Sequence, residues 1–264
     1  MESKKTSIVL IIILLLIILG LGGYIAVDKL LLNKEDEVVS VVNVDDIDFD
    51  LNALYQINDT LSKFDVAFND PNSSYFGYLY SAGNRLMASK FDNGAALFAT
   101  IYPRLTNSSS KYVASGIVKK DFEKIFGKNL AYKPTSVNAG DKYNISYNDA
   151  MGNFTYTSPA SADPYQRGYV VINRGTKLTE DSVIITRRVF YVEYQGSEGA
   201  VTSAQIYTNA NKSKLIGTIN LRNNVLSEDE ILAKYSSKFE EYTYTFKQNN
   251  SSADYSFYSI EKTR

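Results

Sequence analysis

The sequence predicts an α+β protein in which an N-terminal transmembrane helix precedes helices packed on one face of a twisted antiparallel sheet. Three observations support this. Residues 6–27 form an uncharged, strongly apolar stretch. Between residues 51 and 126, apolar side chains recur every three or four residues, as on one face of a helix. After Leu130, large apolar and polar residues alternate, as in strands with one buried face. A cystatin-like or nuclear-transport-factor-like curved sheet has this order of elements, which is an analogy of fold only.

The apolar stretch near the amino terminus predicts a membrane helix. Thr6–Val27 is 22 residues long and carries no charge. At ~1.5 Å per residue such a helix covers a hydrocarbon core of ~30 Å, and it offers no polar face to water. Lys4 and Lys5 precede it, whereas the bases that follow are offset by acids, so the positive-inside rule keeps the amino terminus in the cytoplasm. We therefore expect a single-pass protein of the cell membrane.

The predicted domain organisation follows from this helix. Residues 1–5 are a cytoplasmic tail, residues 6–27 a transmembrane signal anchor, residues 28–44 a juxtamembrane spacer and residues 45–264 an extracytoplasmic α+β domain. A cleaved secretory signal is the alternative, because three glycines between residues 20 and 23 are small enough for a processing site. The apolar run resumes after these glycines, which favours an anchor.

Composition excludes several kinds of chemistry. The 264 residues include no Cys and no His, so disulfides, Cys/His zinc sites, thiol nucleophiles and imidazole bases are excluded. The formal net charge is -1, which does not favour a nucleic-acid partner. No glycine-rich phosphate loop is present, and no metal site or cofactor is predicted.

The first predicted helix starts at Leu51, with Asp50 as its cap, and its apolar stripe ends at Phe68. Asp70-Pro71 must break it, because a proline disfavours helical conformation in the residue before it. The aromatic run Tyr75–Tyr80 then predicts a short strand.

Two more helices are predicted before the sheet. The alanine-rich run Ala95–Tyr102 favours a buried helix that Pro103 helps to end. Ser115 is expected to cap the next helix, and Gly127 suits its carboxyl end, where a left-handed residue is needed.

Alternating patterns predict an antiparallel sheet in the second half. Each strand combines β-branched or aromatic residues with polar ones, and Asn, Asp or Gly occupies several of the turns between them. Arg174–Thr176 is expected to separate two strands, and Ser227–Glu230 predicts the capping box of a short helix. The predicted strands are residues 143–147, 154–157, 169–173, 183–194, 203–207, 215–221, 242–246 and 255–260.

Five residues of the predicted sheet are candidate ligand-binding residues: Tyr169, Arg187, Arg188, Tyr191 and Tyr244. The chain has 21 Tyr, and tyrosines that alternate with Ser, Thr or Asn suit half-buried strands as well as sugar or peptide binding. The two arginines are adjacent in a strand, so they should face opposite sides. Either can recognise a carboxylate or phosphate, with edge protection or a cross-strand ion pair as the alternative.

The acidic clusters have simpler interpretations than catalysis. Residues 46–50 open like a calcium loop, but Leu51 and Ile57 stand where Gly and Glu would be needed. Glu228–Glu230 suit the first turn of a helix, and Glu240–Glu241 suit a solvated strand end. Two carboxylates ~5 to 9 Å apart can still hydrolyse a glycosidic bond, so this possibility stays open, and no catalytic residue is assigned.

The layout resembles a group of uncharacterised single-pass surface proteins of AT-rich Gram-positive bacteria. The likeness lies in the basic amino terminus with its anchor, in Tyr75–Tyr80, in Phe122–Gly127, and in the closing strands at 242–246 and 255–262. No activity is assigned to that group. The resemblance therefore implies location and fold, and no mechanism.

These patterns favour a membrane-anchored, extracytoplasmic, non-catalytic module that binds a peptide, a glycan or an envelope protein through an aromatic sheet face. Its expected partners are the lipid bilayer, through residues 6–27, and that ligand, with no nucleic acid and no cofactor. The alternatives are a carboxylate-dependent, glycan-directed envelope hydrolase and a purely structural envelope protein.

Overall fold

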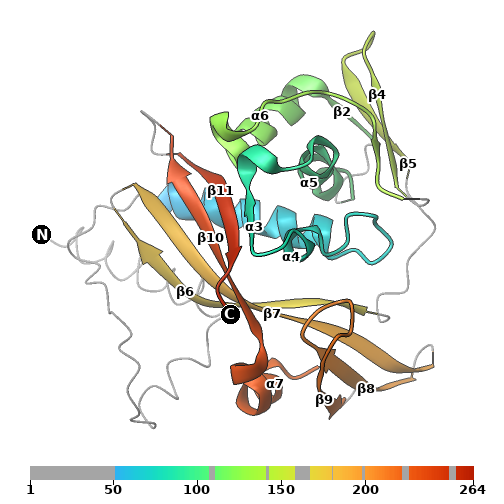
Figure 1. Ribbon diagram of the computed structural model, residues 1–264. Helices are drawn as coiled ribbons and strands as arrows, with labels where there is room; N and C mark the ends of the chain where they lie inside the picture. The colour runs from blue at the N-terminus through green and yellow to red at the C-terminus, as the bar shows by residue number, and fades with distance from the viewer. Residues whose placement is uncertain are drawn as a thin grey trace, which may run out of the picture. The chain divides into compact units, whose positions relative to one another are not determined.

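The computed structural model describes residues 51–106, 111–140, 143–157, 167–179, 181–197, 200–221, 226–249 and 254–264. They belong to one compact unit, Asp48–Arg264, and have the predicted α+β class (Figure 1). The predicted tail, anchor and spacer lie outside the described residues, as does the acidic run 46–50. None of the helices in the described ranges combines the length and apolarity needed to cross a membrane.

The larger antiparallel sheet is built around one long strand, β7. Its order among the described residues is β1-β11-β10-β7-β8-β9, and β6 pairs with the opposite edge of β7. The strands predicted at 183–194, 203–207, 215–221, 242–246 and 255–260 are confirmed. Its strands are β1 (Arg85–Met87), β6 (Arg167–Leu178), β7 (Ser182–Ser197), β8 (Ala200–Tyr207), β9 (Leu215–Asn220), β10 (Glu240–Gln248) and β11 (Tyr255–Lys262).

The predicted break at Arg174–Thr176 is wrong, because β6 runs through it. Asn173 is opposite Arg187 and Gly175 is opposite Thr186, so Arg174 is the extra residue of a β-bulge. A bulge leaves one residue unpaired without ending the strand, and it changes the direction in which the side chain of that residue points.

The smaller sheet confirms the predicted hairpin and adds two short strands. Its order is β2-β5-β4-β3, with β4 and β5 forming the hairpin. The Asn148 side chain accepts a hydrogen bond from the Met151 amide at 3.1 Å, which stabilises the turn. The strands are β2 (Tyr112–Ala114), β3 (Val137–Asn138), β4 (Asn144–Asn148) and β5 (Asn153–Thr157).

The first two predicted helices form, but the second ends later than expected. Helix α3 is Leu51–Phe68, as predicted, and helix α5 is Asn93–Thr106. Pro103 lies inside α5 and does not end it. A proline inside a helix costs ~3 kcal/mol because it lacks an amide hydrogen, and the burial of Pro103 together with Tyr102 and Leu105 offsets that cost.

Helix α6 (Ser115–Phe126) begins without the expected cap. Ala114 occupies the cap position, and the Ser115 hydroxyl lies 2.7 Å from the Tyr132 hydroxyl instead. Its carboxyl end is as predicted, because Gly127 has φ 56° and its amide bonds to the Glu123 carbonyl. A Cβ at Gly127 would lie 2.6 Å from the Ser256 hydroxyl oxygen, so the position requires glycine.

The strand predicted at Tyr75–Tyr80 is wrong. This segment forms turns and the four-residue helix α4 (Tyr78–Ser81). Gly77 has φ 67°, which is incompatible with a strand, and its amide bonds to the Phe68 carbonyl at 2.8 Å. The aromatic side chains of this compact turn pack against the core. Their burial, and not their strand propensity, therefore determines the conformation of the segment.

Helices cover both faces of the larger sheet, which corrects the prediction of a single covered face. Helices α3, α5 and α6 pack in a core on one face with Val183, Ile185 and Tyr191 of β7. Phe190 and Val192 of β7 face a second core that contains Ile231 of α7 (Glu228–Tyr235). Figure 1 shows α7 on the side of β7 away from α3 and α4. The short 3₁₀ turns are η2 (Ala88–Lys90), η3 (Gly127–Asn129) and η4 (Ser236–Lys238).

Candidate functional site

The structure divides the five candidate residues between the two faces of the sheet. Tyr169, Tyr191, Tyr244 and Arg187 are buried on the face that carries α3, because alternate residues of a strand share a face. Arg188 directly follows Arg187 in β7, so its side chain lies on the opposite face. It forms the predicted cross-strand ion pair with Glu241, at 2.8 Å.

The tyrosines of the first face are interior residues. The Tyr80 ring is 4.8 Å from that of Tyr169, and the Tyr80 hydroxyl is 3.1 Å from that of Tyr244. Asn69 binds both the amide and the carbonyl of Tyr169, at 2.6 and 2.7 Å. Burial raises the pKa of Tyr244 to about 12, although the positive charge of Arg187 opposes this. The turn that was predicted as a strand therefore covers this aromatic face.

A pocket of about 360 Å³ opens beside these tyrosines, between α3 and strands β6 and β7. One wall is a stripe of α3, whose residues are spaced so that they share one face of the helix. The other wall is formed by β6 and β7. Its lining residues are Asn58, Leu61, Ser62, Asp65, Val66, Asn173 and Arg187.

An ion pair between Asp65 and Arg187 forms one end of this pocket. Both terminal nitrogens of Arg187 donate to the carboxylate, Nη1 to Oδ1 at 3.0 Å and Nη2 to Oδ2 at 2.5 Å. The Arg187 side chain is 6% exposed and the Asp65 side chain 32%. Burial alone would lower the pKa of Arg187, but the negative charge of Asp65 outweighs burial and raises it. The pair is electrically neutral and only its carboxylate side is open to solvent.

Arg187 is too buried to offer its remaining donors to a ligand, because its side chain is only 6% exposed. Its terminal nitrogens bind Asp65, its guanidinium carbon lies 5.4 Å from the centre of the Tyr244 ring, and its Nε is buried without a hydrogen-bond partner among the described residues. Asp65 keeps accepting capacity, and Asn58, Ser62 and Asn173 are exposed. The described lining of the pocket thus offers amide, hydroxyl and carboxylate groups and carries no net charge.

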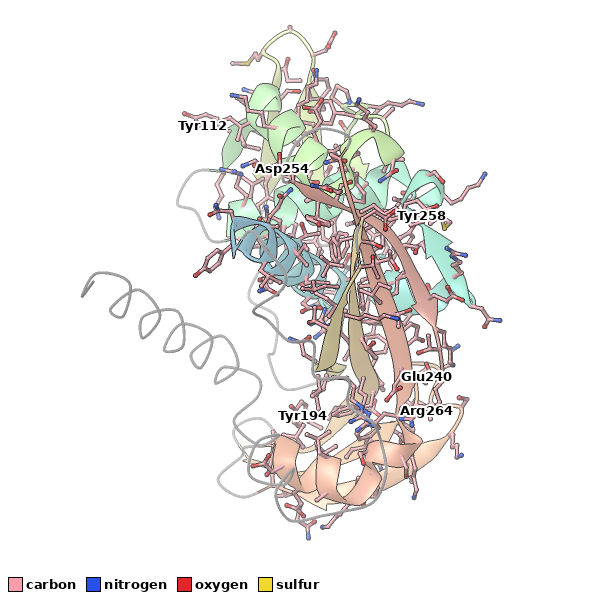
Figure 2. All side chains as sticks on the ribbon, turned by 90° about the vertical axis from the view of Figure 1, so that its left-hand side faces the viewer. Tyr112, Tyr194, Glu240, Asp254, Tyr258 and Arg264 are labelled. Atoms are coloured by element: carbon pink, nitrogen blue, oxygen red, sulfur yellow. The ribbon has the colours of Figure 1, made fainter. Side chains whose placement is uncertain are left out.

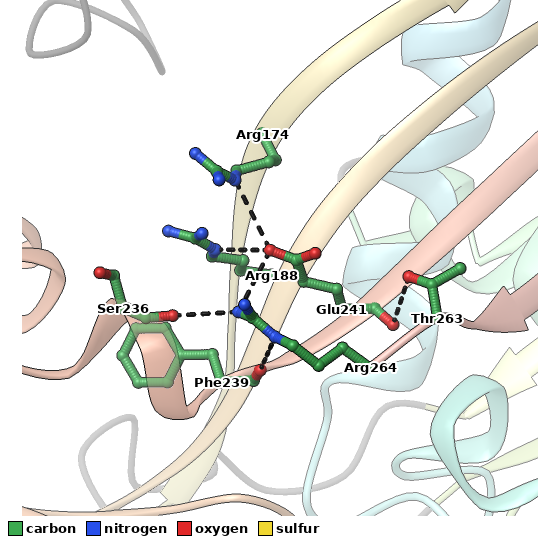
Figure 3. Close-up of polar contacts among 7 residues, drawn as sticks. All are labelled: Arg174, Arg188, Ser236, Phe239, Glu241, Thr263 and Arg264. Atoms are coloured by element: carbon green, nitrogen blue, oxygen red, sulfur yellow. Dashed lines mark hydrogen bonds and ion pairs between the residues drawn. The ribbon is translucent and has the colours of Figure 1, made fainter. Parts of the chain in front are cut away.

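A second polar cluster lies on the opposite face, around Glu241. This residue was expected to be a solvated charge, but its side chain is only 17% exposed and three arginines surround it (Figure 3). Figure 2 shows Glu240 and Arg264 at the end of the sheet next to α7, away from Tyr258. Burial alone would raise the pKa of Glu241, but the hydrogen bond from Arg188 and the charges of Arg264 and Arg174 lower it.

A third cluster has a structural role. The Asp70 carboxylate accepts hydrogen bonds from the hydroxyls of Tyr102 and Tyr143, and from the Asn72 amide at 2.9 Å. These contacts join the turn after α3 to α5 and to the segment before β4. Burial and the bonds to Asp70 raise the pKa of both tyrosines.

Within the described ranges, no group of three or more Asp or Glu side chains could hold a metal ion. No family model, curated protein or solved structure matches this chain.

Proposed function

We propose that this chain is a membrane-anchored, non-catalytic binding module that holds an uncharged, hydroxyl-rich ligand of the glycan class in the pocket between α3 and β6–β7. The observation that carries the proposal is the Asp65–Arg187 pair, which presents a positioned carboxylate without net charge. A neutral pocket does not attract an ionic ligand, whereas a fixed acceptor suits hydroxyl donors.

The rest of the lining supports a sugar. Asn58, Ser62 and Asn173 add both donors and acceptors, and Val66 adds an exposed apolar contact. Tyr55 is 48% exposed and precedes Asn58 by three residues, so it lies on the same face of α3. An exposed tyrosine ring offers the flat apolar surface on which a sugar ring can pack.

The same lining favours binding over hydrolysis. Glycoside hydrolysis needs two carboxylates on either side of the scissile bond. Asp65 is the single carboxylate among the described residues that line the pocket, and both of its oxygens are engaged by Arg187. The membrane part of the proposal rests on the sequence of residues 6–27, and the surface location on the charges that flank them.

Ligand binding is tested with the full chain in polyoxyethylene-detergent micelles and the N-acetylglucosamine tetramer as probe. Titration calorimetry compares the wild type with S62W, which fills the pocket from an exposed position. We expect S62W to weaken binding at least ~10-fold, a loss of ~1.4 kcal/mol. The matched control is K120W, which places the same indole on an exposed position of α6. Equal affinities in S62W and K120W, or no binding by the wild type, would refute the proposed pocket.

Anchoring is tested separately in intact bacterial cells that express the chain with a tag after Arg264. Protease added outside the cells should remove the tag, and the residual fragment should stay in the membrane fraction. Tag protection in intact cells, or recovery of the chain in the soluble fraction, would contradict the anchored arrangement without bearing on the pocket.

A further inference from the structure

One end of the unit Asp48–Arg264 exposes large apolar side chains. Tyr112 of β2 is 64% exposed, Ile117 of α6 is 45% exposed, and Met151 in the turn between β4 and β5 is 71% exposed. Figure 1 shows this turn projecting beyond α6, and Figure 2 shows Tyr112 at the end of the unit away from Glu240. Exposed apolar side chains that gather at one place are typical of a contact surface.

The backbone brings these three side chains to the same end. The Ser115 amide donates to the Gly152 carbonyl at 2.8 Å, which holds the first turn of α6 beside the hairpin turn. Met151 precedes Gly152, and Ile117 follows Ser115 by two residues. Strand β2, which carries Tyr112, pairs with β5 directly after the same turn. We call the end formed by Tyr112, Ile117 and Met151 the apolar tip.

Two lysines of α6 continue from the apolar tip along the helix. Lys120 and Lys124 follow Ile117 by three and seven residues, so the three side chains share one face of α6. Both lysines are exposed, and neither forms an ion pair with another described residue. We call these two residues the lysine row. A helix face with an apolar residue at one end and unpaired lysines behind it has both chemical groups that an anionic lipid surface attracts.

The acidic residues of this region do not cancel the charge of the lysine row. Asp121 pairs with Arg104, whose Nε donates to it at 3.0 Å, and Glu123 pairs with Lys119 at 3.8 Å. Asp149 in the hairpin turn offsets one positive charge. The chain from β2 to η3 contains four lysines and two acids, an excess that the formal net charge of -1 for the whole chain hides.

We propose that the apolar tip and the lysine row dock on the surface of an anionic lipid bilayer. The apolar side chains enter the region between head groups and acyl chains, and the lysines contact the anionic head groups. The apolar tip favours a bilayer over a soluble polyanion, because a polyanion binds lysines but gains nothing from exposed apolar side chains. The docking surface shares no residue with the pocket, so the inference does not depend on the glycan ligand.

Tryptophan fluorescence tests the contact, because the chain contains no other Trp. M151W places an indole at the apolar tip and keeps the hydrogen bond from the backbone amide to the Asn148 side chain. The full chain is placed in nanodiscs whose lipids carry brominated acyl chains, which quench a tryptophan that reaches them. We expect phosphatidylglycerol to quench M151W at least ~2-fold more than phosphatidylcholine does.

The matched control is L215W, which places the same indole at a position 51% exposed on β9, at the other end of the unit (Figure 1). Neither lipid should quench it. Equal quenching of M151W and L215W, or equal quenching of M151W in the two lipids, would overturn the proposal.

Charge reversal tests the lysine row. In the M151W chain, K120E/K124E should lower the ratio of docked to undocked chain at least ~10-fold, because each lysine near an anionic surface contributes a factor of about 5. The control K177E/K214E reverses two exposed charges elsewhere and should leave the quenching unchanged. Circular dichroism checks that both variants are folded. An equal loss of quenching in both variants, or no loss in K120E/K124E, would contradict the docking surface.

Hydrogen–deuterium exchange of the wild type identifies what covers the apolar tip. Phosphatidylglycerol nanodiscs should slow amide exchange in residues 115–120 and 149–153 relative to phosphatidylcholine nanodiscs. Equal protection by soluble poly(glycerol phosphate) would assign the surface to a polyanion, and protection that depends on two chains sharing one phosphatidylcholine disc would assign it to a second copy. Either result would overturn the bilayer contact. A chain that leaves phosphatidylcholine discs but stays on phosphatidylglycerol discs would contradict the anchor and support the docking surface.

Discussion

Arg187 and Arg188 are neighbours in one strand, yet the two faces of the sheet use them differently. On the helix face, Arg187 is almost fully buried and one carboxylate engages both of its terminal nitrogens. On the other face, Arg188 is one of three arginines that share Glu241. The comparison teaches that the number of partners, and not the residue type, decides whether an arginine completes an isolated pair or belongs to a larger ion cluster.

Breaking the buried pair should have the largest effect. R187M leaves Asp65 against the core without its cation, and we expect a loss of about 3 kcal/mol in the free energy of unfolding. Urea denaturation of the full chain measures it. The control R85M removes an arginine of the same sheet from an exposed pair with Glu261, and it should cost less than about 0.5 kcal/mol. A similar cost in both variants would show that burial does not distinguish the two arginines.

Tyr244, which lies beside Arg187, should make the stability of the folded chain fall at alkaline pH. The pKa of Tyr244 in the folded chain is about 12, above its ordinary value of 10.0, so its stabilising contribution is complete below pH 10 and is lost as the pH rises towards 12. Y244F also removes the bond to Tyr80, at a cost of about 1 kcal/mol. Its stability should fall less steeply above pH 10 than that of the wild type, as measured by urea midpoints. If the urea midpoints of the wild type and Y244F fall equally above pH 10, Tyr244 is not held in its neutral form by burial.

Glu241, on the opposite face, should cause a smaller loss of stability at acid pH. Its pKa is lowered in the folded chain, so its contribution is present above the ordinary value of 4.5 and is lost as the pH falls through the lowered value. E241Q should cost about 1 kcal/mol at neutral pH and should weaken the acid dependence below pH 4.5. Thermal unfolding between pH 3 and pH 7 checks this, and an unchanged acid slope would argue against it.

The smallest effect is expected for Arg174. Its side chain is 43% exposed and lies 3.5 Å from a carboxylate that two other arginines already contact. R174Q should change the free energy of unfolding by less than about 0.5 kcal/mol, because it removes repulsion together with attraction. A loss above 1 kcal/mol in urea denaturation would mean that Arg174 serves stability, which would weaken the comparison between the two faces.

Regular periodicity made most of the fold predictable. The stripe of α3 and the alternation in β7, β10 and β11 are local patterns that coincide with burial, so propensity and packing agree there. The predictions failed where tertiary contacts outweigh propensity. Tyr75–Tyr80 has strand-forming residues, but Gly77 and the bond to the Phe68 carbonyl fold it into a turn over the sheet.

The candidate site was predictable only in part. The alternation rule placed Arg187 and Arg188 on opposite faces, and the cross-strand pair of Arg188 was one of the stated alternatives. Asp65 was missed, because its distance in sequence from Arg187 hides a contact that only packing creates. The spacing of Asn58, Ser62 and Asp65 on one face of α3 was the available signal, but the sequence does not show which strands lie against that face.

Hydrogen–deuterium exchange of the full chain with the N-acetylglucosamine tetramer tests the central claim most directly. The pocket predicts that a saturating probe slows amide exchange in residues 58–66 of α3 and near Asn173 of β6, and leaves residues 236–241 unchanged. Protection confined to residues 236–241, or no protection in residues 58–66, would contradict the assignment of the neutral pocket as the glycan site.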